Sequence, residues 1–403
     1  MTETTTALSP DIGHATEINP ARQTAVYYVA FLFLGLIMMV LGTTLPEIAR
    51  RTNAGFDHIS YSFLFRSMGF FLGALFGGRI YDRIKRGHRV LAAAIGTMAL
   101  LSATVPITPK LGILIASFLL QGLAGSLINV GGNTLLMWTH RNNVGALLSG
   151  LHFSWGLGSA ILPLIVEQIE KLTGDISWAY WAVSVLAIPL CWMLLSMPSP
   201  AHPIRSDEDG KQRVILPLAI MVAVFFFFYT GFEASVINWI HTYTIETGLG
   251  SKSAAYKLNS AFLLLFTFGR LLAIPIATRL RPRTILMADF GLALLSVGVL
   301  LIWQHSVTAL WVGCCGLGLA IASVFPTMLS FAQRRMHLSG KLTGYLFSAS
   351  SGGSMVLPFI VGQFFAAVGP HVLFLIVIIA MTIDIVIFST LMALYPSQIP
   401  RKQ

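Results

Sequence analysis

The chain contains 403 residues, of which 55% are hydrophobic and only 10% are charged. Soluble domains carry about 25% charged residues, and here the apolar residues gather in blocks of about 20. These values exclude an ordinary soluble protein and predict helices that cross a lipid bilayer. The net charge of +10 arises from short basic clusters between the apolar blocks. Such clusters are typical of topology signals, so we expect the lipid bilayer as a partner and no nucleic acid.

Twelve membrane-spanning helices are predicted from the apolar blocks. In chain order they lie at 24–46, 58–80, 90–107, 112–138, 143–167, 177–197, 214–243, 254–279, 284–303, 308–332, 342–366 and 371–395. The longest polar gap separates six spans from six. We therefore expect an all-α polytopic membrane protein with a tail over 1–23, a six-helix bundle over 24–197, a linker over 198–213, a second six-helix bundle over 214–395 and a tail over 396–403.

The basic residues predict the orientation of the chain. The termini and the even-numbered loops hold 18 Lys and Arg residues, whereas the odd-numbered loops hold 6. Loops rich in these residues stay in the cytoplasm, so both tails and the linker are predicted to be cytoplasmic. The first 23 residues lack the features of a signal peptide, so the first span is expected to remain in the protein. We expect a monomer in a bacterial inner (plasma) membrane.

An internal repeat supports the division into six and six spans. The segment from Gly158 to Val166 matches the segment from Gly353 to Val361 at six of nine positions, with an offset of 195. At an offset of 200, residues 69, 79 and 83 coincide with residues of the same type at 269, 279 and 283. The halves therefore look like parallel copies, with a chance match of short apolar segments as the alternative.

Twelve spans, a duplication of six and a central linker resemble the major facilitator superfamily. The loop after the second span resembles its signature, with Gly78, Asp82 and Arg83 at matching positions. The glycine that usually follows the Asp-Arg pair by two places is replaced by Lys85. We expect Gly78 to permit a close helix approach and Asp82 and Arg83 to act in gating. Plain loop charge would explain the arginines but not Asp82.

Five charged residues lie within predicted spans, where burial is costly and a functional role is the default interpretation. They are Arg66, Glu233, Arg270, Asp289 and Asp384. Glu233 and Arg270 lie at similar depths on neighbouring helices, so an ion pair is predicted. Substrate or a coupling cation could compete for its carboxylate, or the pair could be purely structural. Arg66 either extends outward to the membrane surface or faces a central cavity.

The two remaining acids have weaker interpretations. Asp289 lies close to the cytoplasmic end of its span, and a structural or gating bridge to the nearby arginines 279, 281 and 283 is favoured over a substrate contact. Asp384 is central in the twelfth span, and the sequence suggests no partner for it.

Neutral polar residues also lie within the spans. Asn129 and Asn133 recur at helical spacing on the fourth span, and His152 lies one turn before Gly156 on the fifth. Asn238 lies about 140° around the helix from Glu233, so both can face one cavity only if the seventh span is bent or unwound. Amides, a carboxylate and indole faces in an apolar tunnel suit a polyhydroxylated ligand. For Trp239 an interfacial aromatic belt is the alternative.

A narrower resemblance covers the fourth, fifth, seventh and eighth spans. The Tyr229–Tyr243 segment and the run from Phe268 to Ala273 look like the sodium-dependent glucose transporter-like group and the fucose, galactose and glucose proton symporters. The resemblance implies a sugar symporter. With Trp155, which lies beside His152, the expected substrate-binding residues are Asn129, Asn133, His152, Trp155, Glu233, Asn238, Trp239 and Arg270, and the expected ion-pair and coupling residues are Glu233, Arg270 and Arg66.

One departure concerns coupling. The fucose symporters carry carboxylates on the first and fourth spans, where this chain has Thr43, Thr44 and the two asparagines. Glu233 is then the central carboxylate that could bind Na⁺ or H⁺, and a uniporter remains open. The three cysteines lack the spacing of a metal site, so no metal or other cofactor is expected.

The expected function is secondary transport of a small polar solute, a monosaccharide in the first place, by alternating access. An exporter of drugs or other metabolites with the same fold is the alternative. An intramembrane enzyme is not expected, because His152 and Ser154 lack an orienting acid and no His-Glu-x-x-His motif occurs. A non-transporting receptor would not need the central charges.

Overall fold

The computed structural model describes residues 19–84, 86–140, 144–200, 216–336 and 340–395. Most of both predicted tails and of the linker lie outside the described residues. Within them, twelve helical segments are long and apolar enough to cross a membrane, as predicted. The helix ends fall within a few residues of most predicted boundaries.

The first six spans come from eight helices and one short 3-10 turn. They are α1 (Pro20–Arg51), α2 (Phe56–Ile59) followed by α3 (Tyr61–Arg83), α4 (Gly87–Thr104) with the 3-10 turn Val105–Ile107, α5 (Leu111–His140), α6 (Val144–Thr173), and α7 (Ser177–Val185) with α8 (Ala187–Leu195).

The last six spans come from seven helices. They are α9 (Leu216–Glu246), α10 (Lys252–Arg279), α11 (Pro282–Ile302), α12 (Val307–Ile321) with α13 (Val324–Gln333), α14 (Gly340–Val368) and α15 (Val372–Leu394).

Besides the short interruption at Ser60 near the start of the second span, the sixth and tenth spans contain breaks away from their ends that hydropathy did not predict. The sixth is interrupted at Leu186 and the tenth at residues 322–323. In a regular helix the backbone carbonyls of Val185 and Ala322, at these two breaks, would each accept a hydrogen bond from the N–H four residues later. Those positions are occupied by Pro189 and Pro326. Because proline has no backbone N–H, these helical hydrogen bonds cannot form.

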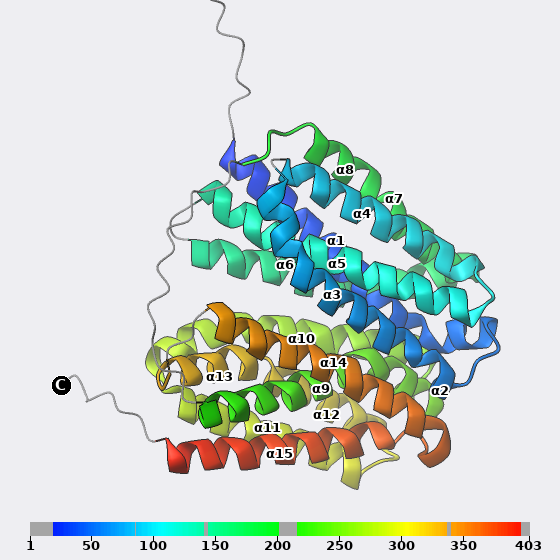
Figure 1. Cartoon of the computed structure of the whole chain (residues 1–403). Helices are drawn as coiled ribbons and strands as arrows, with labels where there is room; N and C mark the ends of the chain where they lie inside the picture. The colour runs from blue at the N-terminus through cyan, green and yellow to red at the C-terminus, as the bar shows by residue number, and fades with distance from the viewer. Residues whose placement is uncertain (1–18, 85, 141–143, 201–215, 337–339, 396–403) are drawn as a thin grey trace, which may run out of the picture.

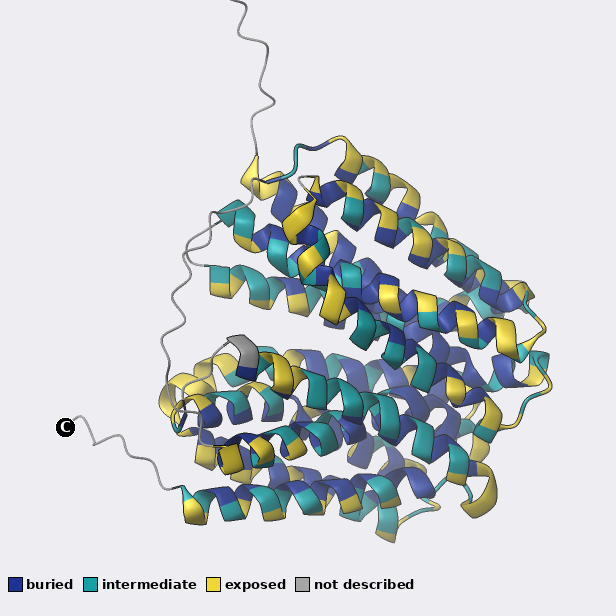
Figure 2. Cartoon of the chain, in the orientation of Figure 1, coloured by how far each residue is buried: buried dark blue, intermediate teal, exposed yellow. Residues whose placement is uncertain are grey.

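The helices form two bundles, α1–α8 and α9–α15, which lie one above the other in Figure 1. We call the face where α1 begins and α15 ends the terminal face, and the opposite face the distal face. Exposed residues line the outward sides of both bundles in Figure 2, on α4 and α8 and on α15. Many are large and apolar, such as Ile188, Trp192 and Ile379, as expected of a surface in contact with lipid.

The sequence repeat corresponds to repeated packing contacts. A Cβ added at Gly158 of α6 would overlap the carbonyl oxygen of Leu32 on α1, and one added at Gly353 of α14 would overlap that of Phe227 on α9. Both partners of the second contact lie 195 positions after those of the first. The backbones of the first and fifth spans thus approach closely in each copy, which requires the absence of a side chain.

A second contact repeats at the offset of 200. Gly69 of α3 lies against the carbonyl oxygen of Leu119 on α5, and Gly269 of α10 lies near that of Leu319 on α12. The expectation for Gly78 is wrong in this conformation, because a Cβ added there would meet no atom within 4 Å. The close approach of α3 to α5 occurs at Gly69 and Gly73 instead.

The two bundles meet most firmly at the distal face. Lys252 of α10 forms an ion pair with Glu170 of α6, and Tyr256 donates a hydrogen bond of 3.0 Å to the same carboxylate. Ser253 donates to Glu167, which is buried. We call these five residues the distal lock. On the other edge, the Gln363 amide of α14 donates to the carbonyl oxygen of Asp57 at 2.7 Å. The distal face is therefore closed.

Exchanging Gly69 for alanine should destabilise the protein, because the added methyl group would overlap the backbone of α5. We expect a loss of about 1–3 kcal/mol, seen as a lower melting temperature of the purified protein in detergent. Gly78→Ala on the same helix is the matched control and should leave the melting temperature unchanged or slightly raised. Equal destabilisation by both substitutions would contradict this packing.

Candidate transport site

The predicted partners Glu233 and Arg270 lie together, each in the interior of its membrane-spanning helix. The Arg270 Nη2 atom of α10 is 3.1 Å from the Glu233 Oε1 atom of α9. The Glu233 side chain is 12% exposed and that of Arg270 is 35% exposed, so the pair is accessible from the arginine side. The guanidinium also lies over the Phe266 ring, 4.2 Å from its centroid, and its Nε has no hydrogen-bond partner. That Nε atom is itself buried, so a donor that a ligand can reach must lie elsewhere on the partly exposed guanidinium.

Tyr229 connects this pair to the break in the tenth span. It lies one turn before Glu233 on α9, is fully buried and donates a hydrogen bond of 2.7 Å to the carbonyl oxygen of Ile321, the last residue of α12. Asp289 of α11 accepts a hydrogen bond from Ser323, which lies in the break. Among the described residues Asp289 forms no ion pair with arginine 279, 281 or 283, so the expected bridge is wrong in this conformation.

Arg66 faces the boundary between the bundles rather than the outer membrane surface. Its Nη1 atom donates to the carbonyl oxygen of Met38 at 2.8 Å, and its Nη2 atom donates to the Asn238 side-chain oxygen at 3.1 Å. The guanidinium carbon lies 5.7 Å from the centroid of the Phe63 ring. Met38 and Phe63 belong to the same bundle as Arg66, whereas Asn238 belongs to the other. The contact to Asn238 thus crosses the boundary.

The helix that carries Glu233 and Asn238 is not unwound between them. α9 is continuous from Leu216 to Glu246, so the two side chains point to different neighbours. Glu233 reaches α10, and Asn238 reaches α1 and α3. The two residues therefore lie at different heights along the boundary and do not line one shared pocket.

The first bundle contributes the remaining polar groups. The Asn133 amide of α5 donates to the Asn129 carbonyl oxygen at 2.8 Å, and both side chains are half-buried. His152 of α6 is exposed and makes an edge-to-face contact with Phe31, while Trp155 is half-buried.

His152 and Arg270 lie at the same level across the boundary. Gly156 of α6 packs directly against Thr267 of α10. The two helices run in opposite directions, so one further turn toward the terminal face leads to His152 on α6 and to Arg270 on α10. The ring pair Phe153 and Phe268, with centroids 5.8 Å apart, joins the helices at this level.

Trp239 lies in a closed aromatic cluster near the distal face, which adjoins Arg66 through Phe63. It is fully buried, its indole N–H donates to the Pro358 carbonyl oxygen at 3.0 Å, and its ring stacks on Phe365. Phe56 and Phe63 complete the cluster. Its burial excludes an interfacial belt position, and no ligand reaches it in this conformation.

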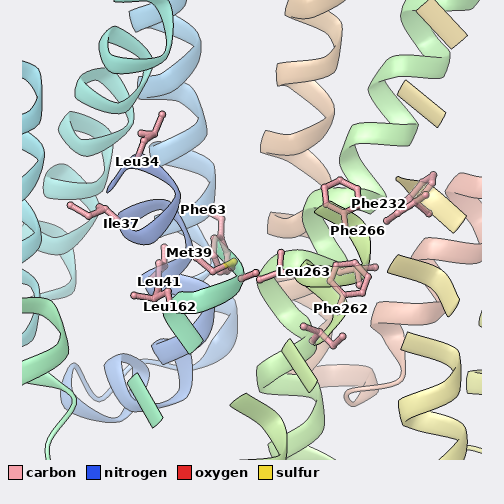
Figure 3. Close-up of a cluster of buried hydrophobic side chains, with 14 of the residues drawn as sticks. Leu34, Ile37, Met39, Leu41, Phe63, Leu162, Phe232, Phe262, Leu263 and Phe266 are labelled. Carbon is pink, nitrogen blue, oxygen red and sulfur yellow. The ribbon is translucent and has the colours of Figure 1, made fainter. Parts of the chain in front are cut away.

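Buried apolar side chains lie on both sides of the boundary. In Figure 3 the labelled side chains form two groups, one on each bundle, and Leu263 of α10 points toward Met39 of α1. The first group contains Leu34, Ile37, Met39, Leu41, Phe63 and Leu162, and the second contains Phe232, Phe262, Leu263 and Phe266. A few polar groups among apolar walls are typical of small-molecule sites.

The gating candidates on α3 are exposed at the terminal face. Asp82 and Arg83 end the helix there. Arg83 and Arg79 line a shallow groove with Phe76, Ile80 and Ile84.

The sequence did not identify two features of the boundary. The distal lock could not be recognised, because a loop lysine such as Lys252 indicates topology and does not reveal its partner. The link from Tyr229 to the tenth span was missed because it depends on the break, for which Pro326 was the available signal.

Comparisons with known proteins agree with this architecture. The profile of the Major Facilitator Superfamily matches residues 27–358, and the chain belongs to this family. It is therefore a secondary transporter of small molecules and not an enzyme.

Two relatives and one solved structure are informative. The chain is 26% identical to sodium-dependent glucose transporter 1A of Mus musculus, over 83% of this chain and 88% of the relative. It is 23% identical to major facilitator superfamily domain-containing protein 4A of Homo sapiens, over 87% of each. A mutant of the nucleoside transporter NupG has the same fold, with a TM-score of 0.72, 15% identity and coverage of 93% of this chain and 99% of that one.

Neutralising one member of the central ion pair should destabilise the protein more than neutralising both. Glu233→Gln or Arg270→Gln alone leaves one charge without its partner, which we expect to cost about 1–3 kcal/mol at this partly exposed site. The double variant should recover at least half of the lost melting temperature. Additive losses in the double variant would mean that the two residues do not stabilise each other.

Proposed function

We propose that the transported solute is a monosaccharide and that Glu233 binds the coupling cation, Na⁺ or H⁺. The observation that carries this proposal is the Glu233–Arg270 pair, in which the Arg270 side chain remains 35% exposed beside the Phe266 ring. Hydroxyl groups of a sugar can accept from Arg270 and donate to the carboxylate, while the Asn129 and Asn133 amides and His152 can supply further hydrogen bonds. The similarity to a sodium-dependent glucose transporter supports the same choice.

The coupling proposal follows from competition between Arg270 and the cation for the Glu233 carboxylate. A proton or Na⁺ on the carboxylate would weaken its attraction to Arg270 and free the guanidinium for the sugar. Cation and sugar would then favour the same state of the site, which is the requirement for coupled transport.

The proposed mechanism is alternating access, with the site open to the terminal face in this conformation. The closed distal lock and the exposed Asp82 and Arg83 support this assignment. In the opposite state the lock would separate, and Asp82 and Arg83 would contact the second bundle. The distribution of basic residues supports a cytoplasmic terminal face. A bacterial inner membrane remains the proposed location.

Counterflow in proteoliposomes tests the substrate and its coupling. Purified protein should exchange labelled hexoses, and a Na⁺ or pH gradient should drive their accumulation. Glu233→Gln should retain exchange and lose accumulation, because the amide cannot bind and release the cation. Glu246→Gln, at the distal end of the same helix, is the matched control and should keep both activities. Absence of hexose exchange in the unmodified protein would contradict the sugar assignment and favour an exporter of other solutes.

Weakening the distal lock should favour the state that is open at the distal face. Glu170→Gln removes an ion pair worth up to about 1 kcal/mol, so maleimide labelling of a cysteine at the buried Ser260 position should accelerate up to about fivefold. The native cysteines are first replaced. Arg50→Gln breaks a distal-face ion pair within α1 and is the control. Equal rates in both variants would show that the lock does not limit opening.

A further inference from the structure

Arg66 carries a positive charge that the surrounding protein does not neutralise. Its side chain is 8% exposed, and its hydrogen bonds go to a backbone carbonyl and to an amide oxygen. Among the described residues, no carboxylate lies within ion-pair distance of its guanidinium. Burying an unpaired charge in a membrane costs several kcal/mol, and neutral acceptors recover only part of it. A site that retains such a charge is suited to an anionic partner.

The sum of the charges along the boundary also indicates an anionic partner. Arg66 and Arg270 contribute two positive charges, and Glu233 contributes one negative charge. Asp289 is turned away toward Ser323, inside the second bundle. Asp384 is fully buried on α15. The boundary therefore lacks one negative charge, and the excess positive charge is located at Arg66.

The hydrogen bonds of Arg66 explain how it could become available. The bond to Met38 stays within the first bundle, so it can persist when the bundles rock. The bond to Asn238 crosses the boundary, so it must break when the distal side opens. Opening would then expose a guanidinium that is still held by one anchor, with its Nη2 donors free. A planar carboxylate is the group that such a fork binds best.

We propose that Arg66 binds a carboxylate of the transported sugar, so that the preferred substrates are acidic monosaccharides such as hexuronates. This inference rests on the proposed function and names its substrate class. Asn238 lies five residues after Glu233 on α9, a rise of about 7.5 Å. On the straight α9 their side chains also point about 140° apart, so we place the carboxylate at Arg66 and assign the same molecule no simultaneous contact with the Glu233–Arg270 pair.

The first test compares three matched ligands in counterflow. They are glucuronate, its neutral amide glucuronamide, and glucose. We expect glucuronate to exchange with a half-saturation concentration at least about tenfold lower than that of glucuronamide, the value of one charge-assisted hydrogen bond in a partly desolvated site. Exchange of glucose without preference for glucuronate would overturn this inference and leave the proposed function standing. Exchange of none of the three would count against both.

Variants test whether Arg66 causes the preference for glucuronate over glucuronamide. Arg66→Gln should abolish the preference for glucuronate over glucuronamide, while Arg66→Lys should keep part of it. Arg335→Gln removes an arginine that contacts Tyr395 and Phe331 far from the boundary, so its preference should equal that of the unmodified protein. An unchanged preference in folded Arg66→Gln protein would overturn the assignment.

Asn238→Asp provides an independent test, because it adds a negative charge beside Arg66 and leaves Arg66 itself unchanged. It places a carboxylate at the position of the present 3.1 Å acceptor and so supplies the missing negative charge within the protein. We expect a higher melting temperature and a half-saturation concentration for glucuronate raised about tenfold or more, because the new carboxylate competes for Arg66. A lower melting temperature together with unchanged glucuronate affinity would overturn the proposal.

Discussion

The bilayer requires that every charge at its centre be compensated by the protein, and this requirement organises the boundary between the bundles. Glu233 and Arg270 compensate each other, and Asp289 accepts a hydrogen bond from a serine that lies in a helix break. Arg66 is compensated only by neutral oxygen atoms, one of them across the boundary. These interactions lie where helices of different spans meet, so a movement of the helices changes which charges are satisfied. Binding and conformational change are thereby linked.

Much of the fold could be predicted from the sequence because hydropathy and helix length are local properties. The twelve spans follow from the apolar blocks, and the central ion pair follows from equal depth on neighbouring helices. The repeat was visible as well, since the close contacts at Gly158 and Gly353 constrain both sequences in the same way.

The remaining features depend on rotation about helix axes and on neighbours distant in the sequence. Hydropathy places Trp239 near the distal end of its span but does not give the direction of its indole, which points into a closed aromatic cluster. The orientation of Arg66 was open for the same reason. Gly78 has the small size that close packing needs, yet α3 uses Gly69 and Gly73 for that contact. These assignments require the relative rotation of packed helices, which composition does not specify.

The two edges of the closed distal face are formed by corresponding spans of the two repeats, but the contacts along them differ in chemistry. The fifth span meets the eighth along one edge through lysines and glutamates, whereas the eleventh meets the second along the other through an amide and a backbone carbonyl. Dissolved salt screens the first kind of contact and hardly affects the second. Rising ionic strength therefore loosens one edge only, and the bundles would begin to part along α6 and α10 while α14 and α2 still hold.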